Sequence, residues 1–289
     1  MDSTRPNAAA TASPSTVPAH CVITATPWGD IAKRLESTAE LLEQATAGLA
    51  SSSDSNVTRS APTCTLTVII PVFNERETLP VVLQRTEEVM PADAELIIVD
   101  DGSTDGTCQW LQQLPASPRR KVICRRRNHG KGSAVRLGIR HSQGDVVAIQ
   151  DADLEYDPFD LLDVIKPIAE NRADVVYGSR YLRQSDDPSV LHRFGNWLLT
   201  ALSNRLTGLK LTDMETCHKA FRGDLIRSIP LRECRFGFEP EITAKIAARK
   251  QRVLEVPTGY ECRGYDEGKK IGWRDGIAAL ACMWRYRPR

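Results

Sequence analysis

Apolar and polar positions alternate along residues 64–177 with two different periods, and the pattern predicts strands and helices in turn. Residues 65–72 form a β-branched apolar run that ends in a Pro-Val-Phe-Asn turn, and helical spacing follows over 75–90. Short apolar runs at 94–99, 121–125, 145–150 and 173–177 then alternate with helical segments at 105–114, 131–141 and 158–170. This alternation predicts an α/β fold: a Rossmann-like, mostly parallel sheet with helices on both faces.

The first 63 residues follow a different pattern. Residues 1–29 are rich in Ala, Ser, Thr and Pro without periodicity, which predicts a disordered tail. After this tail, mostly apolar residues recur in alternating steps of four and three positions, which places them on one face of a single helix near 30–50. They are Ile31, Leu35, Thr38, Leu42, Ala45 and Leu49. Residues 51–63 are typical of a flexible Ser/Thr linker. The helix either docks or self-associates, or it lies on the surface of a folded domain that we expect over 64–289.

Charge and cysteine content narrow the class of protein. The 289 residues hold 38 Lys+Arg and 37 Asp+Glu, and a net charge of +1 argues against a nucleic-acid binder. Eight cysteines without a C-x-x-C pair indicate a reduced, cytoplasmic chain. The longest apolar stretches, 66–73 and 277–284, are shorter than the roughly 18 residues of a membrane span. We therefore expect no spanning helix, and at most peripheral contact with the inner face of a membrane.

Polar clusters follow each of the first four predicted strands. They are Asn74-Glu75, Asp100-Asp101-Gly102-Ser103, Asn128-His129-Gly130-Lys131 and Asp151-Ala152-Asp153. In an open parallel sheet the carboxyl ends of the strands lie along one edge, where ligands bind. Turn chemistry alone explains one such cluster, but four in succession predict a binding site at this edge.

Asp151 and Asp153 stand one residue apart where a buried strand ends, so both carboxylates can face one hard cation. Mg²⁺ or Mn²⁺ favours carboxylate oxygens together with substrate phosphates, which indicates a metal-bridged diphosphate. Glu155 offers a third oxygen. The alternative is an Asp-rich turn that caps the helix near Pro158.

Two further loops resemble known ligand motifs only in part. The segment 100–106 lacks the spacing and the bidentate Glu of a calcium loop. The segment 130–133, Gly-Lys-Gly-Ser, fails the phosphate-loop pattern of an ATPase, because a glycine separates Lys131 from Ser133. Nine Lys/Arg and no Asp/Glu between Arg119 and Arg140 still favour an anion such as a nucleoside diphosphate, and Lys131 is our candidate to contact it.

With these motifs assembled, the sequence resembles the family 2 glycosyltransferases of the GT-A fold, in the branch of the polyprenyl- and dolichyl-phosphate mannosyl- and glucosyltransferases. The matching segments are VIIPVFNERETL (68–79), ELIIVDDGSTDGT (95–107), NHGKGSAVRLGI (128–139), GDVVAIQDADLEYDP (144–158) and VVYGSRY (175–181). Weaker matches are HRFGNWLLTALSNRLTG (192–208), DMETCHKAFR (213–222) and EVPTGYECRGYDEGKKIGW (255–273).

The resemblance implies roles for residues on the donor side. Pro71, Phe73 and Glu75 would border the nucleotide base, and Asp101 would meet the nucleoside. The resemblance also assigns Asp151 and Asp153 to the metal-binding motif. Glu155 stands where many members of this branch have Gln.

On the acceptor side, the resemblance implies that Arg180 and Arg193 hold an anionic phosphate, for which the guanidinium fork is suited. A phosphate acceptor is already a nucleophile and needs positioning and charge stabilisation rather than a base. A hydroxyl acceptor needs a general base, and the sequence offers Asp213, Glu239 or Glu241. Asp213 occupies the place of the family's second acidic motif.

The function expected from the sequence is transfer of a hexose, with inversion, from GDP-mannose or UDP-glucose to a polyprenyl phosphate with Mg²⁺ or Mn²⁺. Alternatives are a hydroxyl acceptor on a glycan or small molecule, or a sugar-nucleotide-binding protein without turnover. A nucleotidyltransferase would place a Gly-rich basic loop after the first strand, where this chain has the acidic run 74–77.

The C-terminal segment 263–289 holds seven Lys/Arg and three Asp/Glu, a net charge of +4. Trp273, Ile277, Leu280, Met283 and Trp284 recur in it at roughly helical spacing. A basic amphipathic helix with Trp at both ends suits a membrane surface, whereas the same apolar face also suits packing on the domain.

Overall fold

The computed structural model describes residues 64–183, 190–261 and 273–288, all within one unit, Pro62–Arg289. The tail, the helix near 30–50 and the linker expected from the sequence lie outside the described residues. The strands are β1 (Leu66–Val72), β2 (Glu95–Asp100), β3 (Arg120–Cys124), β4 (Val146–Ile149), β5 (Val175–Ser179), β6 (Lys219–Arg222) and β7 (Val253–Pro257). The helices are α2 (Leu79–Val89), α3 (Thr107–Gln113), α4 (Lys131–His141), α5 (Asp160–Ala169), α6 (Val190–Thr207), α7 (Gly223–Ser228), α8 (Phe238–Ala248) and α9 (Trp273–Tyr286).

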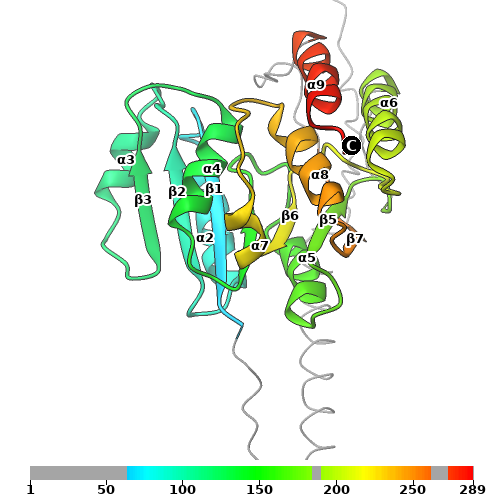
Figure 1. Cartoon of the computed structure of the whole chain (residues 1–289). Coiled ribbons are helices and arrows are strands. Elements are labelled where there is room, and N and C mark those ends of the chain that lie inside the picture. The colour runs from blue at the N-terminus through cyan, green and yellow to red at the C-terminus, as the bar shows by residue number, and fades with distance from the viewer. Residues whose placement is uncertain (1–63, 184–189, 262–272, 289) are drawn as a thin grey trace, which may run out of the picture. The chain divides into compact units, whose positions relative to one another are not determined.

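The strands form one sheet in the order β3-β2-β1-β4-β6-β5-β7 (Figure 1). β1, β2, β3 and β4 pair in parallel, and β5 pairs with β7 in parallel. β6 lies between β4 and β5 and runs antiparallel to both. The predicted α/β fold is therefore confirmed, with one reversed strand that the apolar pattern did not predict.

Side chains alternate along each strand and so divide the core into two layers. On one face, Val68 and Ile70 of β1 belong to a core cluster that includes residues of α2, α3 and α5. On the other face, Ile69 belongs to a cluster that includes residues of α4, α7, α8 and α9. Helices thus cover both faces of the sheet, as the continuous apolar strands predicted.

Helix α9 packs against α8 and α6, and Figure 1 shows α6 and α9 side by side. Met283 and Cys282 of α9 are buried, whereas Leu280 and Trp284 are exposed. The helix predicted at the C-terminus is present, and part of its apolar surface packs on the domain. The side chains of Trp273 and Ile277 lie outside the described residues.

The contact between α4 and β1 depends on a glycine. A Cβ atom placed on Gly138 would lie 2.5 Å from Cγ2 of Ile69, whose side chain is fully buried. By contrast, a Cβ atom on Gly195 of α6 would meet no atom within 4 Å. The two helical glycines therefore form a matched pair: Gly138 is in close contact with the sheet, and Gly195 has open space around it.

We expect Gly138→Ala to lower the free energy of unfolding by roughly 1–3 kcal/mol, because the added methyl group must displace Ile69 in a packed core. Gly195→Ala is expected to be neutral or to stabilise by up to about 1 kcal/mol, because alanine favours a helix. Urea denaturation followed by circular dichroism measures both values. Equal effects of the two substitutions would contradict the close packing of α4 on β1.

Candidate active site

Hydrogen bonds connect the loops that follow the first three strands. The backbone N–H of Asn74, after β1, donates to Oγ of Ser103 over 2.9 Å, and Oδ1 of Asn74 accepts from the N–H of Thr104 over 2.8 Å. Oδ2 of Asp101, after β2, accepts from the N–H groups of His129 and Gly130 after β3. The polar clusters predicted from the sequence therefore lie together at one edge of the sheet.

Asp101 is only 2% exposed, and Nη1 of Arg125 lies 2.9 Å from its Oδ1. Its carboxylate thus holds the loop at 128–130 through Oδ2 and contacts a guanidinium through Oδ1. In this arrangement Asp101 fixes the shape of the loop beside the expected nucleoside site. Pro71 is buried in β1, and Phe73 and Glu75 are partly buried in the turn after it.

Lys131 links the third cluster to the fourth. Its Nζ lies 2.7 Å from Oδ1 and 2.9 Å from Oδ2 of Asp151, and 2.7 Å from Sγ of Cys217. Burial alone would lower the pKa of Lys131, but Asp151 raises it well above its usual range. Burial would raise the pKa of Asp151, but Lys131 holds it below its usual value. Both groups are therefore charged, and the pair is a fixed ionic contact at the end of β4.

Lys131 also begins helix α4, and the glycines around it serve packing. A Cβ atom on Gly132 would lie 2.8 Å from Cβ of Phe238 in α8 and 2.9 Å from the carbonyl oxygen of Glu233. The helix start is therefore pressed against the segment that leads into α8. This contact explains a Gly-Lys-Gly sequence that does not have the spacing of a phosphate loop.

Asp153 and Glu155 lie in the loop after β4 and are partly buried. Oδ1 of Asp153 accepts from the N–H of Glu155, and Oε2 of Glu155 accepts from the hydroxyl of Tyr260. Hard carboxylate oxygens suit Mg²⁺ or Mn²⁺, and such ions use one or two carboxylates plus substrate phosphates. Because Lys131 holds both oxygens of Asp151, the donor set fits an ion centred on Asp153 whose remaining ligands come from water or substrate.

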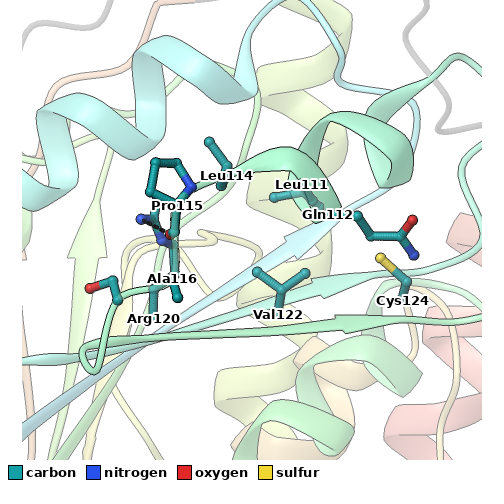
Figure 2. A pocket seen from close by; sticks show the side chains of 9 residues that line it. Leu111, Gln112, Leu114, Pro115, Ala116, Arg120, Val122 and Cys124 are labelled. Atoms are coloured by element: carbon teal, nitrogen blue, oxygen red, sulfur yellow. Dashed lines mark hydrogen bonds between the residues drawn. The ribbon is translucent and has the colours of Figure 1, made fainter.

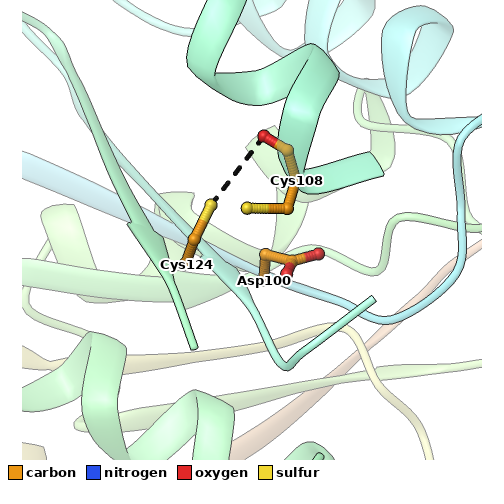
Figure 3. A group of neighbouring side chains, drawn as sticks. All are labelled: Asp100, Cys108 and Cys124. Carbon is orange, nitrogen blue, oxygen red and sulfur yellow. Dashed lines mark hydrogen bonds between the residues drawn. The ribbon is translucent and has the colours of Figure 1, made fainter. Parts of the chain in front are cut away.

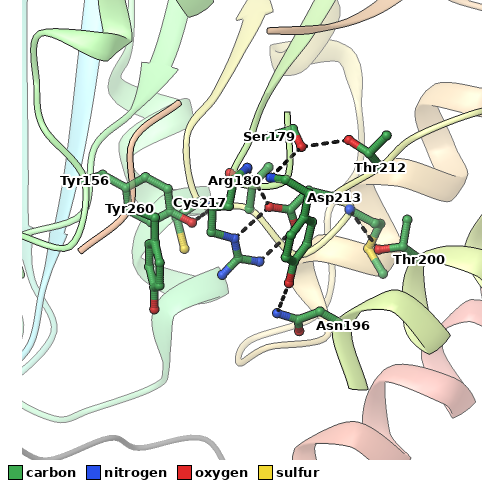
Figure 4. A network of polar contacts seen from close by, with 12 residues as sticks. Tyr156, Ser179, Arg180, Asn196, Thr200, Thr212, Asp213, Cys217 and Tyr260 are labelled. Carbon is green, nitrogen blue, oxygen red and sulfur yellow. Dashed lines mark hydrogen bonds and ion pairs between the residues drawn. The ribbon is translucent and has the colours of Figure 1, made fainter. Parts of the chain in front are cut away.

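At the end of β5, Arg180 and Asp213 form a bidentate ion pair (Figure 4). Nε of Arg180 donates to Oδ2 over 2.6 Å and Nη2 donates to Oδ1 over 2.8 Å. Asp213 is fully buried, and its own N–H donates to Glu255. The guanidinium of Arg180 also lies over the ring of Tyr260, with 5.1 Å to the centroid. The pair therefore fixes the direction of Arg180, and this arrangement favours a positioning role for Asp213 over the general-base role.

The two other general-base candidates, Glu239 and Glu241, also form ion pairs. Oε2 of Glu239 lies 2.5 Å from Nζ of the buried Lys219. Glu241 accepts from the N–H groups of Arg232 and Glu233 and pairs with Lys245 over 2.5 Å. Glu239 thus connects the start of α8 to β6, and Glu241 connects it to the segment before α8.

Arg193 lies apart from this buried network. It is exposed on the first turns of α6, next to the exposed Phe194. Asn196 connects the same part of α6 to the site, because its Nδ2 donates to the hydroxyl of Tyr181 over 3.0 Å. Arg180 thus lies inside the site, and Arg193 lies on the helix beside it.

The segment 215–218 supplies residues that the sequence reasoning did not single out. Nε2 of His218 lies 2.9 Å from Oε1 of Gln150, and the rings of His218 and Tyr156 are tilted by 32° with centroids 4.5 Å apart. Burial lowers the pKa of His218 to about 3, so it is neutral. Glu215 has one oxygen sequestered from solvent without a hydrogen-bond partner among the described residues. Burial, with Glu239 nearby, raises the pKa of Glu215 to about 7.

Glu215 should make stability depend on pH. Between the usual pKa of about 4.5 and the folded value of about 7, the unfolded chain has lost a proton that the folded chain keeps. The free energy of unfolding therefore falls as pH rises through this window, by up to roughly 3 kcal/mol from this group. Glu215→Gln, which is neutral at every pH, should remove this fall. Urea denaturation from about pH 5 to about pH 8 compares the two proteins; parallel profiles would contradict the assignment.

No helix in the described part of the chain is long and apolar enough to cross a membrane. A surface hollow lies between α3 and β3 (Figure 2). None of the site residues predicted from the sequence lines this hollow; its lining residues are Leu111, Gln112, Leu114, Pro115, Ala116, Ser117, Arg120, Val122 and Cys124.

Comparison with solved structures shows a shared fold. Glucosyl-3-phosphoglycerate synthase from Mycobacterium tuberculosis, in complex with Mn²⁺, UDP and phosphoglyceric acid, aligns with a TM-score of 0.60 and 21% identity over 78% of each chain. The same enzyme in complex with UDP gives a TM-score of 0.62 at 19% identity, over 81% of this chain and 85% of the other. The chain therefore has the fold of these GT-A glycosyltransferases.

Among curated proteins, undecaprenyl-phosphate 4-deoxy-4-formamido-L-arabinose transferase of Edwardsiella ictaluri is 31% identical over 71% of this chain. This chain spans 62% of the length of that relative. Undecaprenyl-phosphate mannosyltransferase of Micrococcus luteus is also 31% identical, over 73% of this chain and 90% of the relative. The family model described as glycosyl transferase family 2 matches residues 67–229. The fold, the relatives and this match together show that the chain belongs to glycosyl transferase family 2.

Proposed function

We propose that this chain is a metal-dependent, inverting glycosyltransferase that moves a hexose from a nucleotide sugar, GDP-mannose or UDP-glucose, to a polyprenyl phosphate. Two relatives that share 31% identity with the chain are named as undecaprenyl-phosphate sugar transferases, which supports this acceptor class. The observation that carries the choice of a phosphate over a hydroxyl acceptor is the pairing of the candidate bases.

Each of the three carboxylates that the sequence offered as a general base contacts a cation: Asp213 contacts Arg180, Glu239 contacts Lys219, and Glu241 contacts Lys245. A hydroxyl acceptor must give up a proton in the transition state, so it needs a base with access to that proton. A phosphate acceptor is already an anion and needs only to be held in line with the sugar. The paired carboxylates therefore favour the phosphate.

On the donor side, the ion pair of Lys131 and Asp151 fixes the geometry of the polar edge of the sheet. This is the edge from which we expect the nucleoside diphosphate to leave. A Mg²⁺ or Mn²⁺ ion held by Asp153, with Asp151 and Glu155 near it, would stabilise negative charge on the diphosphate. Lys131 adds a positive charge to the same edge, and Asp101 keeps the loop at 128–130 in place. We propose that Pro71, Phe73 and Glu75 border the base.

On the acceptor side, Arg180 would contact the phosphate, and the exposed Arg193 would attract or hold it from α6. Helices α6 and α9 carry five of the eight large apolar side chains that are exposed among the described residues. These five are Phe194, Trp197, Leu198, Leu280 and Trp284. A guanidinium beside exposed apolar side chains suits an acceptor with a charged head and an apolar tail. We propose that these helices make peripheral contact with the membrane that holds the acceptor.

Asp153→Ala is expected to lower turnover at least about 100-fold, because the ion that stabilises the leaving diphosphate loses a ligand. The assay follows transfer from each of a panel of nucleotide sugars to polyprenyl phosphate in detergent, with Mn²⁺ or after chelation. Asp157→Ala is the matched control, because this exposed carboxylate lies in the same loop and caps the N–H of Phe159. Equal activity of the two variants would overturn the metal assignment, and binding of a donor without any product would overturn the enzyme assignment.

Arg193→Ala should lower kcat/KM for polyprenyl phosphate about 10- to 150-fold, because a charge-assisted contact contributes roughly 1.5–3 kcal/mol. The affinity for nucleoside diphosphate, measured by titration with Mn²⁺, should not change. Arg205→Ala is the matched control, an exposed arginine near the other end of α6. If both variants transfer sugar as well as the unmodified chain, Arg193 does not hold the acceptor phosphate. Transfer to a hydroxyl acceptor with no use of the lipid phosphate would favour the alternative acceptor class.

A further inference from the structure

Three ligating side chains meet on the face of the sheet that α3 covers (Figure 3). Asp100 ends β2 and Cys124 ends β3, and the parallel register places these two residues opposite each other. Cys108 reaches the same point from the first turn of α3. A carboxylate oxygen and the two Sγ atoms all lie within 4.8 Å of one another. Side chains from three separate segments therefore converge at one position.

The carboxylate of Asp100 is incompletely satisfied. Asp100 is fully buried, and its Oδ2 accepts from the N–H of Ser103 over 3.1 Å. Its Oδ1 has no hydrogen-bond partner among the described residues, and no ion pair to Asp100 is present among them. A buried carboxylate oxygen without a partner is costly, and a cation bound at this point would offset that cost. Nothing in the proposed transfer reaction uses this oxygen or either thiol.

The two neighbouring thiols could bind the same cation as Asp100. Sγ of Cys124 lies 4.0 Å from the carbonyl oxygen of Cys108, and both thiols are partly buried rather than sealed in the core. Cys124 also lines the surface hollow between α3 and β3, so the cluster has a route from solvent (Figure 2). Two sulfur ligands and one carboxylate suit Zn²⁺, which takes four ligands and accepts water as the fourth.

We propose that Asp100, Cys108 and Cys124, brought together at the ends of β2 and β3 and the start of α3, bind one thiophilic divalent cation of the Zn²⁺ class. On binding, the two thiols release their protons to solvent and the thiolates coordinate the ion, so no oxidant or reductant takes part. The site differs from the edge at Asp153 in its chemistry, because soft sulfur ligands select a different ion from hard oxygens. The bound ion would connect the ends of β2 and β3 and the start of α3, next to Asp101.

The test uses the full chain, purified with a phosphine reductant, stripped with a chelator and titrated with Co²⁺ as a spectroscopic substitute for Zn²⁺. We expect one equivalent of Co²⁺ to give a thiolate-to-cobalt charge-transfer band and the visible bands of a tetrahedral ion. Zn²⁺ should displace it and raise Tm. Cys108→Ser and Cys124→Ser should each lose the band and weaken Zn²⁺ binding at least about 100-fold in competition with a chromophoric chelator.

Asp100→Asn tests the carboxylate, since the amide oxygen can still accept from Ser103 but carries no charge. It should fold, keep a weaker thiolate band and lose most of the rise in Tm with Zn²⁺. Cys64→Ser and Cys234→Ser, which alter exposed cysteines, should bind as the unmodified chain does.

Cys217→Ser is the sharpest control, because Cys217 lies beside Asp151 at the candidate active site. Loss of the cobalt band in this variant, with the band intact in Cys108→Ser, would place the ion at the active site and overturn the proposal. Failure of the reduced chain to bind Co²⁺, with its thiols free by titration, would also overturn it. So would a Cys108–Cys124 disulfide that persists under reductant in peptide mapping.

Discussion

The ion pair between Lys131 and Asp151 is the contact on which the candidate active site depends. In the sheet, β3 and β4 are separated by β2 and β1, so the two residues come from segments that the strand order keeps apart. The start of α4 bridges that gap, and it is set in place by Asp101 on one side and by the close approach of Gly132 to α8 on the other. Loss of either partner would leave a charge that is about four-fifths or more buried, at a cost of roughly 3–5 kcal/mol.

A second buried pair, Arg180 with Asp213, organises the other half of the edge. The two pairs use opposite arrangements of charge, because the carboxylate of Asp151 follows β4 in one pair and the cation of Arg180 follows β5 in the other. In both, the cation that we propose to contact ligand is held by a carboxylate that is less exposed. Both pairs are formed in the absence of substrate, and side chains already held in place reduce the ordering that binding must supply.

The sequence predicted most of the parallel half of the fold because its signals are local. Strand runs, helical spacing and the polar clusters after each strand can be recognised within a dozen residues, and the predicted span of α4, 131–141, matches the structure. The reversed strand β6 was not predicted, because a run as short as Lys-Ala-Phe-Arg carries no directional signal. The metal, donor and acceptor roles of the individual residues remain predictions.

The ion pairs could not be predicted from the sequence, for a related reason. Asp213 and Arg180 are separated by 33 positions, and Lys131 and Asp151 by 20, so their contacts exist only after the sheet is assembled. The pattern therefore named Asp213 as a candidate base, whereas the fold buries its carboxylate against Arg180. For Glu215, the motif at 213–222 marked the segment, but the burial that shifts its pKa comes from the surrounding fold.

The reversal of β6 has a consequence for the order of assembly. Because β6 runs against its neighbours, the residues that enter it, 213–218, arrive at the edge where β4 and β5 end. Because β6 also lies between β4 and β5, the sheet can close there only when the chain has been made as far as Arg222, whereas β1 to β4 are already complete at Ile149. Distant pairings form more slowly than near ones. During synthesis, strands β1 to β4 should thus pair first, whereas the contact of α4 with α8 and the joining of β5, β6 and β7 must wait for the later part of the chain.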